Sequence, residues 1–339
     1  MSGKKVALVL SSGGPRGFAY IGAIEELLDR GYEITSIAGT SAGSLVGGIY
    51  AAGGLEAFKE WLYALDPMKV VSLMDFSFSK SHLVNGDRVI NAIRKRVPDR
   101  RIEDLPIRFT AVAADLYTGE EVLFREGLLF EAIRASISIP LMFRPVQWQG
   151  RTLIDGGTVN TFPLNRVERT PGDILIGFNV NRIDAERIRS YLKDRETLVA
   201  SEAVIRDEAR LLLRDTLSSG TRPVMARLRT AGEKGGELLK EGLEAGRQVR
   251  RLESDSRHVG IPTDAGDNHV SILDRSFGIM NHTIARMGIE LCPPDILVEM
   301  PLDSYQGVAA YSRAREIAAA GRALMARALD TYEASGSAR

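Results

Sequence analysis

Ser41 lies in a G-x-S-x-G sequence whose two glycines are Gly39 and Gly43. The apolar run at residues 34–38 predicts a strand before it, and residues 42–52 have the apolar spacing of a helix after it. A serine on such a sharp strand-to-helix turn exposes its hydroxyl as a nucleophile, and the first amides of the helix face a developing oxyanion. The pattern predicts acyl-transfer chemistry at Ser41. The alternative is that Ser41 only caps the helix.

A second segment of small residues follows the first apolar run of the chain. It contains Ser12, Gly13, Gly14, Arg16 and Gly17. Backbone amides without side chains in the way approach an oxyanion closely, which is usually the largest single contribution to acyl transfer. We expect the amides of Gly13, Gly14 and Arg16 to be the donors, and the Arg16 side chain to hold the loop rather than bind a lipid phosphate. The alternative is a phosphate-binding turn, whose G-x-G-x-x-G pattern fails at Ser12.

Asp155 follows a short apolar run at residues 152–154 and precedes Gly156 and Gly157. An aspartate at the end of a strand can reach sideways into a neighbouring site. Taken alone, D-G-G is more often a turn, in which the aspartate stabilises the bend. Together with the serine turn and the glycine loop, Asp155 becomes a candidate catalytic carboxylate.

In their order and spacing, these three segments resemble those of the patatin-like phospholipases, specifically the single-domain members from bacteria and archaea. Residues 135–146, ahead of the aspartate, and residues 159–163, after it, are also similar to family sequence. The resemblance covers residues 6–180 and resumes weakly at residues 270–328. One departure is Ser12, which stands where the family has its first loop glycine and removes no amide from the loop.

The resemblance implies a carboxylic ester hydrolase with a Ser–Asp dyad. Ser41 would attack the ester carbonyl of a lipid, Asp155 would take its proton, and water would release the fatty acid. The activity would be that of a phospholipase A, a lysophospholipase or a general carboxylesterase, and it needs no cofactor. The alternative is a non-catalytic lipid-binding or regulatory protein on the same fold.

His258, His269 and His282 follow Asp155, so the Ser–Asp–His order of an α/β-hydrolase triad is available. That fold usually places its serine turn after several strands, whereas Ser41 follows the second, so we expect no catalytic histidine. No cluster of His, Cys and carboxylates has metal-ligand spacing, so we expect no metal.

The alternation of strands and helices predicts a layered α/β fold, with a mostly parallel central sheet and helices on both faces. The predicted strands are residues 6–10, 34–38, 107–114, 122–124, 152–154, 174–179 and 296–300, and the predicted helices include residues 18–28, 42–52 and 87–96. We expect a catalytic domain at residues 1–181 and 269–330, and a flexible tail at 331–339. Residues 182–268 predict a charged, amphipathic helical insertion, either an interfacial lid or an oligomerisation element.

Composition narrows the class of protein. Lys and Arg number 44, as do Asp and Glu, which argues against nucleic acid as a partner. The single cysteine fits a reducing compartment, and no stretch has the length of a secretory signal or a membrane span. We therefore expect a soluble cytoplasmic protein that acts on a phospholipid or another fatty-acyl ester. Peripheral contact with the inner membrane face and a homo-oligomer are further expectations.

Overall fold

The computed structural model describes residues 4–74, 86–140, 142–190, 193–194, 240, 244, 269–305 and 307–336. The backbone divides into two compact units, Met1–Ile183 with Asp267–Arg339, and Asp184–Gly266. In the second unit, residues 185–190 form a helical segment. The lid or oligomerisation role predicted for residues 182–268 depends on the rest of that unit, which lies largely outside the described residues.

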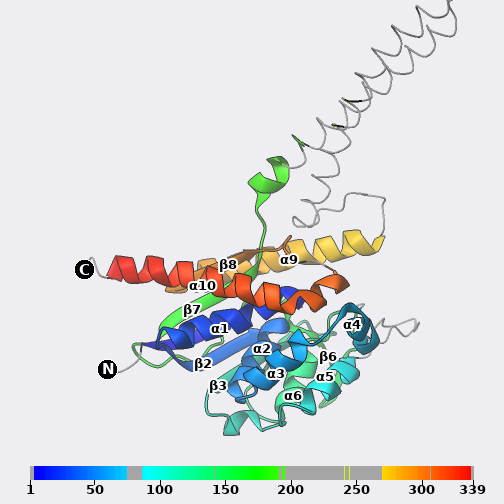
Figure 1. Cartoon of the computed structure of the whole chain (residues 1–339). Coiled ribbons are helices and arrows are strands. Elements are labelled where there is room, and N and C mark those ends of the chain that lie inside the picture. The colour runs from blue at the N-terminus through cyan, green and yellow to red at the C-terminus, as the bar shows by residue number, and fades with distance from the viewer. Residues whose placement is uncertain are drawn as a thin grey trace, which may run out of the picture. The chain divides into compact units, whose positions relative to one another are not determined.

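An eight-stranded sheet runs through the first unit in the order β5-β6-β3-β2-β1-β7-β8, with β4 also paired to β3 (Figure 1). The strands are β1 Lys5–Leu10, β2 Glu33–Thr40, β3 Arg108–Asp115, β4 Glu121–Phe124, β5 Val146–Trp148, β6 Arg151–Asp155, β7 Ile174–Arg182 and β8 Ile296–Pro301. The pairs from β3 through β2, β1 and β7 to β8 are parallel, and the pairs made by β4, β5 and β6 are antiparallel. The mostly parallel sheet confirms the predicted fold class.

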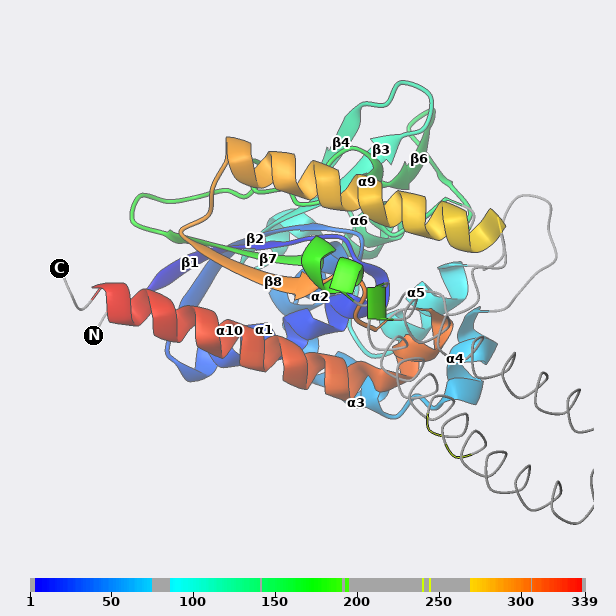
Figure 2. The same cartoon turned by 90° about the horizontal axis from the view of Figure 1, so that it is seen from above.

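Helices cover both faces of this sheet. They are α1 Ala19–Asp29, α2 Ala42–Ala51, α3 Leu55–Tyr63, α4 Pro67–Met74, α5 Gly86–Arg94, α6 Leu129–Ser136, α9 His269–Leu291 and α10 Ala314–Gly336. Short 3-10 helices are η1 Gly14–Phe18, η2 Ile102–Asp104, η3 Gly156–Thr158 and η4 Val308–Arg313. Seen from above, α9 lies along one face of the sheet, and α1 and α10 lie along the other (Figure 2).

Strand β1 shows why the central strands have continuous apolar sequences. Leu8 and Leu10 pack in the main core with α1, α2 and α10, whereas Ala7 and Val9 pack in a second cluster with Ala285 of α9. Successive side chains of a strand point to opposite faces. A strand covered on both faces must therefore be apolar at every position, as the run at residues 6–10 is.

The C-terminal end corrects one prediction. Helix α10 continues to Gly336, so residues 331–336 are helical and the predicted tail is wrong for them. The reason is a cluster of polar contacts to the N-terminal part of the chain. The Tyr32 hydroxyl donates a hydrogen bond to Glu333 (2.8 Å), and Lys4 and Arg30 form ion pairs with the same carboxylate at 3.2 and 3.3 Å. These contacts hold the polar C-terminal end of α10 against the N-terminal part of the chain. The composition of this segment alone predicts a flexible tail.

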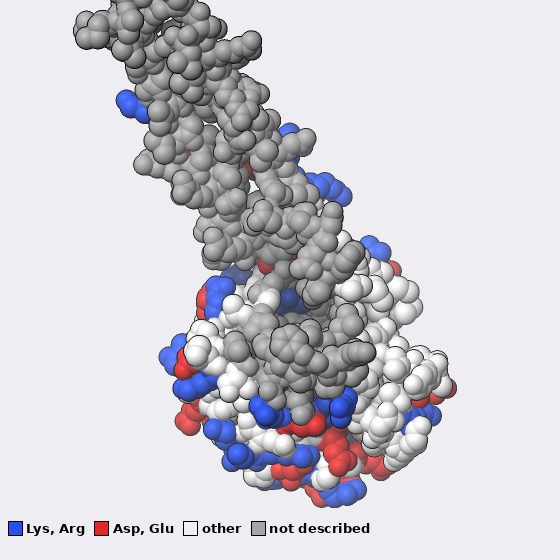
Figure 3. Space-filling view, turned by 90° about the vertical axis from the view of Figure 1, so that its right-hand side faces the viewer, with Lys and Arg blue, Asp and Glu red and all other residues white. Residues whose placement is uncertain are grey.

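The surface of the first unit carries mixed charge. On the face that Figure 3 shows, its Lys and Arg side chains alternate with Asp and Glu side chains, in keeping with the equal totals of the two kinds. Among the described residues, no helix combines the length and the hydropathy that crossing a membrane requires.

Candidate active site

The strand ends that carry Ser41 and Asp155 meet head to head. Strand β2 pairs along β3 as far as Thr40, which lies opposite Val112. The next residue of β3, Ala113, pairs with Asp155 of the antiparallel strand β6. Because β4 occupies the other edge of β3, β6 must continue along the edge that β2 leaves. The carboxyl ends of β2 and β6 therefore face each other, and residues far apart in sequence come together.

Ser41 sits in an unusual backbone conformation between β2 and α2, with φ 54° and ψ −120°. A non-glycine residue held in a sparsely populated region costs about 1–3 kcal/mol and needs support from its surroundings. The Ser41 amide donates to Ser136 Oγ (2.9 Å), which in turn donates to the Val112 carbonyl (2.6 Å). The Ser44 hydroxyl donates to the Ser41 carbonyl (2.7 Å). The turn is thus fixed on both sides of the serine.

The small residues around the serine let the backbone segments approach closely. A Cβ atom on Gly39 would overlap the backbone of Gly43, and one on Gly43 would overlap the Leu10 carbonyl at the end of β1. A Cβ atom on Gly17 would overlap the Ala42 side chain, so the glycine loop packs directly on the first turn of α2. The two motif segments read from the sequence therefore lie against each other.

The glycine loop is tied to the strands on either side of it. The Ser12 amide donates to the Thr161 carbonyl (2.8 Å), and the Asn181 side-chain amide donates to the Ser12 carbonyl (2.7 Å). Arg16 Nε donates to the Val180 carbonyl (2.9 Å) at the end of β7. The Arg16 side chain thus ties the glycine loop to a backbone carbonyl of β7.

Two amides of this loop remain available. In the described part of the chain, neither the Gly13 nor the Gly14 amide donates a hydrogen bond to a protein acceptor. Gly14 has a φ of 55°, which favours glycine, and a Cβ atom on Gly13 would overlap the Val180 side chain. Both positions therefore require glycine, and Gly14 also lines the cavity that Ser41 shares.

Asp155 is buried, with 1% of its surface exposed. Its Oδ1 atom accepts a hydrogen bond from the Gly157 amide (2.7 Å), whereas Oδ2 has no hydrogen-bond partner among the described residues. Burial raises the pKa of Asp155 to about 7, and the neighbouring Ser41 hydroxyl and the Gly157 amide oppose this rise. A carboxyl group with this pKa can take up and release a proton near neutral pH.

The other residues singled out in the sequence lie as follows. Gly156 and Gly157 form the short helix η3 after β6, and a Cβ atom on Gly156 would overlap the Val112 carbonyl. His282 Nδ1 lies 3.0 Å from the Asn181 carbonyl oxygen. His258 and the side chain of His269 are outside the described residues. Within the described ranges, no three His, Cys, Asp or Glu side chains are grouped as a metal site requires.

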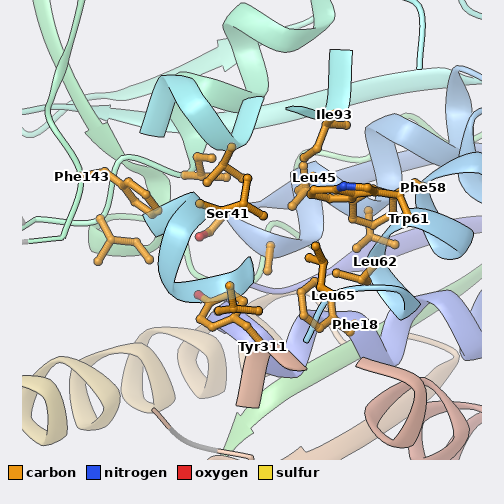
Figure 4. A pocket seen from close by; sticks show the side chains of 18 residues that line it. Phe18, Ser41, Leu45, Phe58, Trp61, Leu62, Leu65, Ile93, Phe143 and Tyr311 are labelled. Carbon is orange, nitrogen blue, oxygen red and sulfur yellow. The ribbon is translucent and has the colours of Figure 1, made fainter. Parts of the chain in front are cut away.

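Ser41 opens onto an apolar cavity (Figure 4). The cavity has a volume of about 100 Å³, and helices α2, α3, α4 and α5 supply most of its wall. Leu45 of α2, Phe58 and Trp61 of α3, and Ile93 of α5 line it. Transfer of apolar groups from water into such a cavity is favourable by about 0.8 kcal/mol per methylene.

Ser136 is a site residue that sequence reasoning missed. It lies in the segment at residues 135–146 that was noticed only for its resemblance to family sequence. Its hydroxyl bridges Ser41 and Val112, and the partner amide is 95 positions away in the chain. No local pattern predicts such a contact, because serine is common at the ends of helices.

Comparisons with known proteins now place the chain. The protein is an α/β protein whose mostly parallel sheet carries a serine at a strand-to-helix turn, with a glycine loop beside the serine. Residues 8–167 match the family described as patatin-like phospholipase. An uncharacterised NTE family protein of Mycobacterium tuberculosis (strain H37Rv) is 35% identical over 346 residues, which cover 98% of this chain and 93% of the relative. The chain belongs to the patatin-like phospholipase family, as the sequence resemblance predicted.

More distant relatives match a part of the chain. A second NTE family protein, from Mycobacterium bovis, is 35% identical over 170 residues, covering 49% of this chain and 28% of the relative. A lysophospholipase of Candida glabrata is 28% identical over 199 residues, covering 56% of this chain and 11% of the relative. The structure of VipD from Legionella pneumophila aligns with a TM-score of 0.33 and 15% identity, over 75% of this chain and 67% of VipD. At the level of its family, the protein is a lipid hydrolase.

Proposed function

We propose that the protein is a serine lipid acyl hydrolase in which Ser41 is the nucleophile and Asp155 is its general base. The observation that carries this proposal is the head-to-head meeting of β2 and β6. It sets a serine in a strained turn beside a buried carboxyl group whose pKa is about 7. A general base works best when its pKa lies near the operating pH.

In the acylation half of the reaction, Ser41 Oγ attacks the carbonyl carbon of a fatty-acyl ester. The hydroxyl proton passes to Asp155 Oδ2, the carboxylate oxygen that has no other partner among the described residues. Hydrogen bonds between such groups often tighten only when substrate binds. The tetrahedral oxyanion accepts hydrogen bonds from the Gly13 and Gly14 amides. The bond to the leaving alcohol then breaks, and Asp155 returns the proton to the alcohol oxygen.

In the second half, water attacks the acyl carbon of the ester on Ser41 and gives a proton to Asp155. The same two amides stabilise the second oxyanion. When the bond between Ser41 Oγ and the acyl carbon breaks, Asp155 returns the proton to the serine, and the fatty acid leaves. No cofactor enters either half.

The apolar cavity supports a fatty-acyl group as the part of the substrate that is bound. Its wall of aliphatic and aromatic side chains offers a hydrocarbon chain many contacts and few polar ones. The substrate class we propose is therefore a phospholipid, a lysophospholipid or another long-chain ester, met at a membrane surface or as a monomer. The competing function is lipid binding without hydrolysis, which would use the same cavity.

A fluorophosphonate probe separates the two functions, because it reacts covalently only with an activated serine. We expect the intact protein to be labelled and Ser41→Ala not to be labelled, with hydrolysis of p-nitrophenyl esters lost in parallel. If the intact protein took up no probe and hydrolysed no ester, while still binding fatty acid, the lipid-binding function would replace the hydrolase.

A further inference from the structure

Tyr311 belongs to η4, far along the chain from residues 8–167 that match the family. It nevertheless lines the same cavity as Ser41 and Gly14. In Figure 4 its ring stands below the serine, and its hydroxyl is the end directed toward the serine side of the cavity. In the described chain, Ser41 and Tyr311 carry the only hydroxyl groups of this lining, whose other side chains are apolar.

The tyrosine hydroxyl lies close to the glycine loop. Its oxygen is 3.6 Å from the point where a Cβ atom of Gly14 would stand. That point is about 2.5 Å from the nitrogen of the same residue, so the hydroxyl lies within about 6 Å of the Gly14 amide. The hydroxyl and the Gly14 amide therefore border the same part of the cavity, where a substrate oxygen can meet both of them.

Packing holds the ring in this place. Tyr311 and Phe18 meet edge to face, with centroids 5.8 Å apart and planes at 77°. The ring also packs on the apolar cluster of Val70 and Phe143. An aromatic ring fixed by such contacts holds its hydroxyl at little further entropic cost, so the hydroxyl is preorganised for whatever lies between it and the loop.

We infer that the Tyr311 hydroxyl is a further hydrogen-bond donor to the oxyanion formed at Ser41, beside the Gly13 and Gly14 amides. The inference rests on the proposed function. A phenol is a neutral donor at neutral pH, so it strengthens its hydrogen bond as negative charge develops on the substrate oxygen. The C-terminal part of the chain thereby contributes directly to catalysis.

The test is Tyr311→Phe, which removes the hydroxyl and keeps the ring that packs on Phe18. We expect kcat on a p-nitrophenyl ester to fall about 100-fold, as after the loss of one oxyanion donor, with KM within twofold. The matched control is Tyr305→Phe. Its ring stacks on Arg313 at 4.9 Å, it is not in the cavity lining, and it should keep the intact protein's kcat.

The kinetic constants decide between a donor and a wall residue. A fall in kcat at constant KM supports the donor, because that interaction exists only in the transition state. Unchanged kcat, with or without a raised KM, would overturn the inference and leave Tyr311 as a wall residue. A different result would contradict the proposed function itself: the intact protein would neither react with a fluorophosphonate nor hydrolyse any ester. That result would also rule out the inference about Tyr311. A thermal melt of both variants checks that each is folded.

Discussion

The polar end of the site and its apolar wall are built in different ways. At the polar end, backbone segments touch one another, and a single added carbon on Gly39, Gly43 or Gly156 would overlap a neighbouring backbone group. Along the wall, side chains from α2, α3, α4 and α5 line a cavity. In the function that we propose, backbone geometry fixes the reacting groups, and exchangeable side chains select the acyl chain.

The two regions also differ in how their polar groups are satisfied. Ser12 Oγ, Asp155 Oδ2 and Asn181 Oδ1 are buried without a hydrogen-bond partner among the described residues, and all three lie around the glycine loop and the end of β6. A buried polar atom left in this way costs about 1–3 kcal/mol. Among the described residues, no side-chain polar atom of the apolar wall is buried without a partner. In the proposed function, one of the three atoms at the polar end, Asp155 Oδ2, accepts the proton of the serine.

We expect the largest loss of activity from substitutions of Ser41 and Asp155 at the polar end of the site. Ser41→Ala and Asp155→Asn should each lower kcat/KM for ester hydrolysis by about 10⁴-fold or more, because nucleophile and base act as a unit. Both substitutions keep the volume of the side chain nearly constant, so the fold should persist. His282→Ala is the control, and steady-state kinetics with a soluble ester is the measurement. A loss in His282→Ala as deep as that in Asp155→Asn would replace the dyad by a triad.

A smaller effect is expected in the glycine loop. Gly14→Ala should lower kcat by about 10²–10³-fold, because its φ of 55° disfavours alanine and the new methyl group points at the Tyr311 hydroxyl. Ser12→Gly should be nearly neutral, since it removes no amide. Intact turnover in Gly14→Ala would show that the loop does not serve the reaction.

The raised pKa of the buried Asp155 predicts how kcat/KM depends on pH. The base must be ionised to accept the serine proton, and its pKa is about 7. The value of kcat/KM should therefore be constant above this pH and fall tenfold per unit below it, reaching about 1% of the plateau at pH 5. An ordinary exposed aspartate, with a pKa of about 3.9, would keep nearly full activity down to about pH 5. A flat profile from pH 5 to 8 would argue against Asp155 as the base.

We expect the smallest change in activity from a substitution in the apolar wall of the cavity. Trp61→Ala lengthens the cavity, so longer acyl chains should gain about fourfold in kcat/KM per methylene newly buried, which corresponds to about 0.8 kcal/mol. Hydrolysis of the shortest ester should stay the same. Trp148→Ala is the matched control, because the other tryptophan packs on Phe124, away from this cavity. Equal losses at all chain lengths in Trp61→Ala would mean that Trp61 supports the fold rather than the selectivity. A series of p-nitrophenyl esters provides the measurement.

The sequence by itself determined the local parts of this protein. The run at residues 6–10 predicted β1, and the serine pattern predicted the turn between β2 and α2, because strand, turn and helix signals depend on neighbouring residues. The family also followed from the sequence, since the serine turn, the glycine loop and Asp155 occur in a characteristic order. The end of α10 was misjudged, because its contacts to Tyr32 and Lys4 come from the opposite end of the chain.

Only the tertiary structure decided how the local parts meet. That β6 takes the edge of β3 left by β2 is a matter of sheet register, which no single segment encodes. The support of the Ser41 turn by Ser136, the place of Tyr311 beside the glycine loop and the cavity wall all join segments that are distant in sequence. The raised pKa of Asp155 has the same origin: burial sets it, and burial is a property of the packed molecule.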